Sequence, residues 1–141
     1  MTPNFTLEEF TRSQTAARRG IDNTPSEAIK QNILRIAYKL EIIRMVIDRP
    51  ITITSGYRCI DLNRLIGGAT NSAHTQGLAV DFVVGGMTPE QIIKEIKHVV
   101  NYKQIINEFG RWVHLAIPEK QTGKHLIAER INGKVKYTNV A

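Results

Sequence analysis

One short apolar run, residues 78–84 (LAVDFVV), contains a single aspartate, Asp81. An apolar run of this length predicts a largely buried strand. A carboxylate inside such a strand is energetically costly unless it is paired or bound to a metal. His74 lies in the polar loop just upstream, and Gly77 allows the chain to turn sharply between the two residues. Either His74 and Asp81 hold a metal ion, with zinc as the first candidate, or Asp81 caps a loop beside a surface histidine.

Length and cysteine content limit the other possibilities. The 141 residues suit one domain spanning residues 1–141, and Cys59 is the only cysteine, so any metal must be held by His, Asp or Glu. No apolar run approaches the ~20 residues of a membrane span. The N-terminus has neither a basic start nor an apolar segment, so we expect a protein made in the cytoplasm without a signal peptide.

The formal net charge of +6 suggests an anionic partner, and both nucleic acid and an anionic cell-wall polymer would qualify. However, the basic residues are scattered along the chain, and no aromatic residues interleave with a basic run. Scattered charge is usually only a solvated surface, so we expect no nucleic-acid partner.

Capping signals place the first helices. Thr6 and Glu9 form a capping box, which predicts a helix over residues 7–17. Thr24 is the expected N-cap of a second helix over residues 25–47. The apolar residues of this second helix recur at steps of three and four, which predicts one buried face, formed by Ile29, Ile33, Ile36, Leu40, Ile43 and Ile47.

The remainder of the chain alternates strands with short helices. Helices are expected at residues 61–66 and 89–100, and strands at residues 51–54, 78–84, 102–108, 112–117, 125–131 and 135–137. Residues 109–111 would join one hairpin, and Asn132-Gly133 is a strong signal for another. This order predicts an α+β fold in which N-terminal helices pack on a mainly antiparallel sheet.

A catalytic zinc site needs a third protein ligand and leaves its fourth position to water. His114 lies in an otherwise apolar strand, where a histidine needs a partner, either a metal or a backbone group. His98 is expected at the surface of a helix or at its boundary, and His125 is a weaker candidate at the start of a late strand.

Two charged residues could complete a hydrolytic site. Glu108 precedes His114 by six positions, on the other strand of the expected hairpin. A carboxylate beside a zinc-activated water can take its proton and pass it to a leaving amine. Arg58 follows the strand at residues 51–54 in a tight turn, where a guanidinium can grip a substrate carboxylate. The alternatives are a surface charge at a strand end for Glu108 and a surface ion pair for Arg58.

Together these residues resemble a known family. Ser55-Gly56-Tyr57-Arg58, then Ser72-x-His74-x-x-Gly77-x-Ala79-x-Asp81, then Glu108 and Trp112-x-His114 are similar to the zinc D-alanyl-D-alanine carboxypeptidase-type peptidases. That group includes phage and bacterial peptidoglycan peptidases, the vancomycin-resistance dipeptidases and the Hedgehog signalling domain on the same fold. The resemblance covers the chain from its N-terminal helices to about residue 117.

The resemblance implies a Hedgehog/DD-peptidase-like fold with one zinc ion bound by His74, Asp81 and His114. It also implies Glu108 as general base and Arg58 as a catalytic and substrate contact, with Ser72 and Tyr57 in substrate binding. Some members place the catalytic glutamate three residues before the last histidine ligand, where this chain has Arg111, and the position of Glu108 matches the Hedgehog branch. Some members also carry a histidine where this chain has Trp112.

The implied substrate is the peptidoglycan stem peptide, cut by a carboxypeptidase or endopeptidase activity. The enzyme would act on the bacterial cell wall as a phage-released or virion-carried protein, or otherwise in the cytoplasm, and we expect a monomer. A non-catalytic zinc module that binds cell wall or a protein ligand is the first alternative. A basic nucleic-acid binder without metal is the second.

Overall fold

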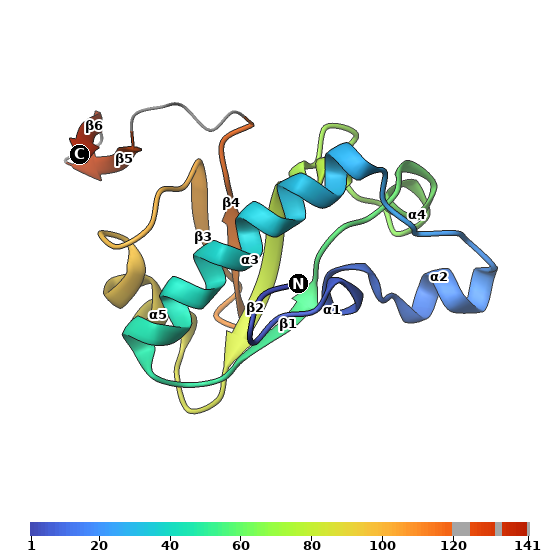
Figure 1. The fold of residues 1–141 in the computed structure, drawn as a ribbon, viewed down its shortest axis with the longest axis horizontal. Helices are drawn as coiled ribbons and strands as arrows, with labels where there is room; N and C mark the ends of the chain where they lie inside the picture. Colours follow the sequence, from blue (N-terminus) through green and yellow to red (C-terminus); the bar gives the residue numbers. More distant parts are fainter. Residues whose placement is uncertain (120–124, 132–133, 141) are drawn as a thin grey trace.

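The computed structural model describes residues 1–119 in full and, beyond them, the backbone of strands at residues 125–131 and 134–140. It is an α+β fold in which α3 crosses one face of a four-stranded sheet (Figure 1). The helices are α1 (Leu7–Thr11), α2 (Gln14–Arg19), α3 (Glu27–Ile47), α4 (Ile60–Leu65), the short 3-10 helix η1 (Ala73–Gln76) and α5 (Pro89–Ile96). The strands are β1 (Ile51–Ser55), β2 (Ala79–Val84), β3 (Gln104–Glu108), β4 (Trp112–Ala116), β5 (His125–Ile131) and β6 (Lys134–Val140).

The sheet has the strand order β1-β2-β4-β3, and every pair in it is antiparallel, which confirms the predicted fold class. The two expected hairpins are also present as strand pairs, because β3 pairs with β4 and β5 pairs with β6. The Asn132-Gly133 turn predicted for the second hairpin lies outside the described residues. This strand order places β2 and β4 at the centre of the four-stranded sheet, where each has a neighbour on both sides.

The core lies between the sheet and α3. As predicted, the apolar face of α3 is buried, and only Ile29 at its first turn is partly exposed. From the sheet, alternate residues of β2 and β4 pack in the same cluster, because successive side chains of a strand point to opposite faces. These core residues are Val80, Phe82, Val84, Val113 and Leu115. The opposite face of β2 and β4 therefore remains for polar side chains.

The expected helix over residues 7–17 is wrong, because the chain forms two helices there. The capping box of Thr6 and Glu9 starts α1 as predicted, but Arg12 and Ser13 have extended backbone. The Ser13 side chain accepts a hydrogen bond from the backbone of Ala16 and so caps a new helix. A serine side chain competes for backbone N–H groups in this way and favours a cap over a helix interior.

Two other boundaries differ from the sequence-based expectation. The N-cap of α3 is Ser26 rather than Thr24, because the Ser26 side chain accepts from the backbone N–H of Ile29. The helix expected to reach residue 100 ends at Ile96. In the described part of the chain, no helix has the length and apolar character needed to cross a membrane.

Candidate metal centre

Three neighbouring elements bring His74, Asp81 and His114 together. Asp81 on β2 is directly paired with His114 on β4, so both side chains leave the sheet on the face opposite the core. His74 belongs to η1, which ends at Gln76 and is followed by Gly77 just before β2 begins. Gly77 has a φ of 68°, a left-handed conformation that suits glycine, and it turns η1 back toward the strand. The sharp turn that was predicted at Gly77, between His74 and Asp81, is thus confirmed.

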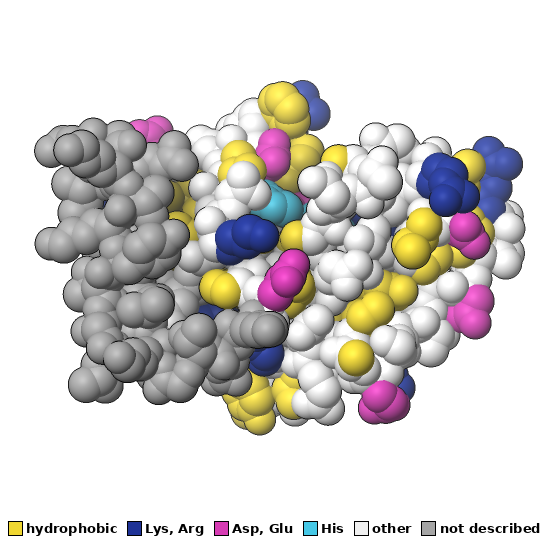
Figure 2. Space-filling model, turned by 90° about the horizontal axis from the view of Figure 1, so that it is seen from above, with side chains coloured by type: hydrophobic (Ala, Val, Ile, Leu, Met, Phe, Trp, Pro, Cys, Tyr) yellow, Lys and Arg dark blue, Asp and Glu magenta, His cyan; other side chains and the backbone are white. Residues whose placement is uncertain are grey.

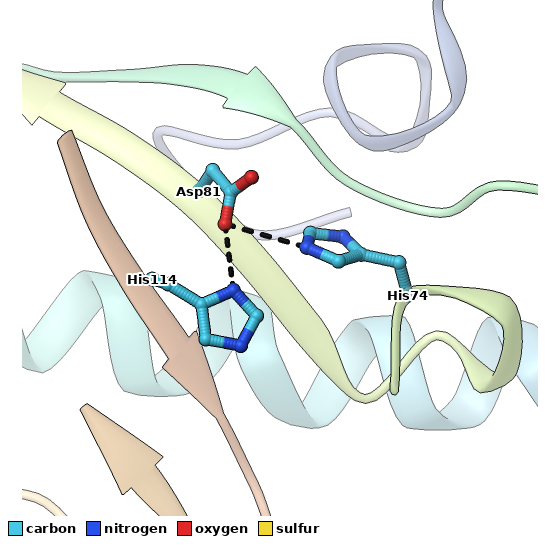
Figure 3. Close-up of side chains that lie close together, drawn as sticks. All are labelled: His74, Asp81 and His114. Atoms are coloured by element: carbon cyan, nitrogen blue, oxygen red, sulfur yellow. Dashed lines mark hydrogen bonds and ion pairs between the residues drawn. The ribbon is translucent and has the colours of Figure 1, made fainter. Parts of the chain in front are cut away.

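The three side chains point toward one another (Figure 3). Nδ1 of His114 lies 2.8 Å from Oδ1 of Asp81, and Nε2 of His74 lies 3.3 Å from the same oxygen. One ligand atom from each residue lies within 4.8 Å of the other two. His74 and Asp81 are buried and His114 is partly buried, so the group can bind one metal ion and still be reached from outside.

Hydrogen bonding fixes which nitrogen of His74 faces the site. Its Nδ1 lies 2.7 Å from the carbonyl oxygen of Gly56, which can only accept, so Nδ1 carries the proton and donates it. In the neutral ring, Nε2 then presents a lone pair to the Asp81 oxygen. Two facing lone pairs repel, so either a proton on Nε2 or a metal ion must lie between the two atoms. Metal-bound histidines characteristically donate the N–H of their other ring nitrogen in this manner. The donor set of two imidazoles and one carboxylate fits zinc.

The electrostatics of Asp81 match this arrangement. Burial by itself raises the pKa of the Asp81 carboxyl, but hydrogen bonds and charge interactions with His114 and His74 outweigh burial and lower the pKa to about 2. The carboxylate is therefore ionised at neutral pH, as a metal ligand must be. The 2.8 Å contact between His114 and Asp81 excludes the alternative in which His114 is a core histidine bonded only to backbone.

Arg58 is held beside the metal-binding group by neutral partners. Its Nε donates to Asn63 at 3.2 Å, and its two terminal nitrogens donate to the hydroxyls of Ser55 and Ser72, each at 3.3 Å. Burial lowers the pKa of Arg58, and the charge of Asp81 partly opposes this. Among residues 1–119 no carboxylate forms an ion pair with Arg58, so the alternative of a surface ion pair is not found within that range.

Glu108 lies near His114 by strand register. His114 is paired with Ile106, and Glu108 is two residues further along β3 on the same face of the sheet. A diagonal pair of this kind is ~7–8 Å apart between Cα atoms, which is within reach of long side chains. Glu108 is partly buried and does not belong to the group of possible metal ligands. Its role as general base stays a prediction.

Of the remaining predicted positions that the structure describes, only Ser72 contacts residues of the site directly. Ser72 accepts from Arg58 and from the backbone N–H of His74, so one hydroxyl joins the two residues. Tyr57 is largely buried in the core cluster and also lines a cleft of about 570 Å³ between α2 and the start of α4. His98 lies outside the metal-binding group, and the side chain of His125 lies outside the described residues.

Two residues that support the site were missed from the sequence. Asn63, which is buried on α4, accepts from Arg58 and donates to the carbonyl of Ala69. Gly56 supplies the carbonyl that orients His74. Gly56 is part of the Ser55–Arg58 motif, but its role depends on a backbone contact that residue type alone does not reveal.

In the space-filling view from above, a histidine side chain is exposed at the surface, with acidic and basic side chains near it (Figure 2). An antiparallel sheet that presents one histidine and one aspartate on its polar face, with a second histidine from η1 and a fixed arginine beside them, defines the class of zinc-peptidase-like α+β proteins. Comparison with known proteins agrees with this class. Residues 3–116 match the family model described as Peptidase M15, and the chain belongs to this peptidase family.

A curated relative comes from the same group of enzymes. The zinc D-Ala-D-Ala carboxypeptidase of Streptomyces albus G is 34% identical to this chain over 83 residues, which is 58% of this chain. The match covers 32% of the relative, so this chain spans about a third of the length of that protein. The resemblance to zinc DD-peptidases inferred from the sequence is thereby confirmed.

Proposed function

We propose that the chain is a zinc peptidase that hydrolyses peptide bonds of the peptidoglycan stem peptide. One observation supports this most directly: a three-residue metal-binding group on the polar face of the sheet, with Glu108 diagonally across from His114. A purely structural zinc site is closed by four protein ligands, whereas a catalytic site has three and an open position. Among the residues that the structure describes, these three ligands leave that position to water or substrate.

In the proposed chemistry, the metal and the side chains of the protein have separate roles. When bound, zinc supplies Lewis acidity, which makes a water more acidic and a substrate carbonyl more electrophilic. Glu108 accepts the proton of the attacking water and then returns it to the leaving amine nitrogen. Arg58 donates hydrogen bonds to the carbonyl oxygen as negative charge develops, or to a carboxylate of the substrate.

The environment of Arg58 supports its proposed role. A guanidinium has five N–H groups, and three of them donate to Ser55, Asn63 and Ser72, which leaves two among the described contacts. The three neutral acceptors hold the guanidinium in place without neutralising its charge. An anionic substrate group can therefore still be attracted to it.

The decisive experiment compares zinc content with hydrolysis. Purified peptidoglycan is incubated with the zinc-loaded wild type and with Glu108→Gln, and the products are identified by mass spectrometry, which also names the bond that is cut. We expect Glu108→Gln to retain one zinc per chain and to lose activity by a factor of about 10²–10⁴. Glu90→Gln, an exposed change on α5, is the matched control.

Two outcomes would contradict the proposal. A zinc-loaded wild type that releases nothing from purified peptidoglycan would favour the non-catalytic zinc module. Equal hydrolysis by wild type and Glu108→Gln would show that another group acts as base.

A further inference from the structure

The turn that joins β3 to β4 holds an aromatic residue in an unusual conformation. Phe109 has a φ of 57°, and Gly110, which follows it, has a φ of 68°. The backbone N–H of Arg111 donates to the carbonyl of Glu108 at 2.9 Å and closes the turn. Positive φ at both central residues is the requirement of a type I′ turn, and such turns strongly prefer asparagine, aspartate or glycine at the first of them.

Phenylalanine is costly at this position for two reasons. A left-handed backbone brings Cβ of an L-residue close to the following carbonyl, at a cost that asparagine and glycine largely avoid. In addition, the Phe109 side chain is 83% exposed, so burial of its ring in the fold does not offset that cost. Neither the turn nor the core explains the residue, and strain of this kind at a defined place is a reason to look for a function.

The ring of Phe109 is nevertheless held in place. It packs edge-on against Trp112, with ring centroids 6.0 Å apart and an interplanar angle of 62°. Trp112 is two residues before His114 on β4, so both side chains belong to the same face of the sheet. Glu108 precedes Phe109 directly and is paired with Trp112. The two aromatic rings therefore stand at the border of the proposed catalytic face.

We propose that Phe109 and Trp112 bind the substrate through an aliphatic C–H surface close to the bond that is cut. This inference rests on the proposed function and specifies how its substrate is recognised. Exposed aromatic rings bury a large apolar area when a ligand packs against them. Two rings that pack edge to face form a rigid surface, so little entropy is lost on binding. The C–H surface could belong to a sugar ring of the glycan strand or to an alkyl side chain of the stem peptide.

Substitution of Phe109 tests the inference because stability and activity should change in opposite directions. Phe109→Asn relieves the strained turn, so we expect Tm to rise by ~3 °C. The same variant should lower kcat/KM by about fivefold on peptidoglycan fragments, chiefly through KM. Phe109→Tyr keeps the ring and should keep wild-type activity. Met45→Gln, at another exposed apolar residue far along α3, is the matched control.

Binding supplies a measurement that does not depend on hydrolysis. Trp112 is the only tryptophan of the chain, so its fluorescence reports directly on ligand contact. Zinc-loaded Glu108→Gln, with and without Phe109→Asn, is titrated with a glycan-free stem peptide and with the same peptide attached to its disaccharide. We expect a change in Trp112 emission and a fivefold weaker Kd in the double variant. Tighter binding of the disaccharide form would assign the contact to the sugar, and equal binding would assign it to the peptide.

Several results would overturn the inference. These are unchanged Kd and kcat/KM in the Phe109→Asn variants, or an emission that responds to neither fragment. If the wild type binds fragments with this dependence on Phe109 but hydrolyses none, the proposed function fails while the contact stands.

Discussion

The carbonyl oxygen of Gly56 accepts a 2.7 Å hydrogen bond from Nδ1 of His74, and this contact joins the turn after β1 to the metal-binding loop. The same turn carries Arg58, whose backbone N–H donates to the carbonyl of His74 at 3.1 Å. The position of a metal ligand and the position of the proposed substrate contact are therefore set by one backbone segment.

Gly56 should not tolerate a side chain. A Cβ at this position would overlap the carbonyl oxygen of Phe10, so Gly56→Ala must displace the turn. We expect a loss of ~2 kcal/mol in the free energy of unfolding and at least about a tenfold loss in zinc affinity, because the orienting partner of His74 moves. Thermal melts and zinc titration measure the two effects. Gly85→Ala, where a Cβ meets nothing within 4 Å, should leave both unchanged.

Metal removal should weaken the fold. The three ligands come from η1, β2 and β4, so zinc bound only by the folded chain stabilises it by mass action. We expect a chelator to lower Tm by ~10 °C, measured by circular dichroism with elemental analysis of the sample. His98→Ala should keep both the metal and the chelator effect, whereas His114→Ala should lose both. A chelator-insensitive melt in a protein without metal would rule out the site.

Asn63 should hold Arg58 in the position from which Arg58 contacts substrate. Asn63→Ala removes the acceptor for Nε of Arg58 and the donor to Ala69, both in a buried position. We expect a destabilisation of ~1–3 kcal/mol, and a higher KM with a smaller change in kcat because Arg58 is less well positioned. Asn63→Asp retains an acceptor for Arg58 but pairs a buried carboxylate with its charge, so the KM should stay high. Asn4→Ala, a change at an exposed amide, should leave KM unaltered.

Acid should loosen the N-terminal segment from α3. Slight burial raises the pKa of Glu41, but hydrogen bonds from the side chain and backbone of Asn4 outweigh it and lower the pKa below its ordinary value of 4.5. A carboxyl whose folded pKa is lowered contributes stability above its unfolded pKa and loses it as pH falls through the folded value. We expect less than about 1 kcal/mol, since the pair is exposed.

The contribution of Glu41 is measurable by comparing wild type with Glu41→Gln in denaturant titrations at neutral and acidic pH. The difference in stability between them should shrink as the pH falls below the ordinary value for glutamate. A difference that grows in acid would show that the sign of the pKa shift is wrong.

Local sequence signals predicted the helices and strands well, but they predicted the ends of the helices less accurately. The capping box at Thr6 and the buried face of α3 follow from short-range rules, and the structure contains them. The break at Ser13 was missed because one side chain can serve either a helix interior or a cap, and only the surrounding contacts choose between them. The shift of the α3 N-cap to Ser26 has the same origin.

The chain by itself limited the residues that can form the metal centre, and the family resemblance implied His74, Asp81 and His114 among them. A carboxylate in a buried strand and a histidine in another require partners, and without cysteine pairs few ligand sets remain. Only the tertiary structure decided the rest. The register between β2 and β4 places Asp81 opposite His114, the turn at Gly56 selects Nε2 of His74, and three neutral side chains hold Arg58. These contacts join residues far apart in sequence, and they depend on strand pairing and packing, which local sequence patterns do not specify.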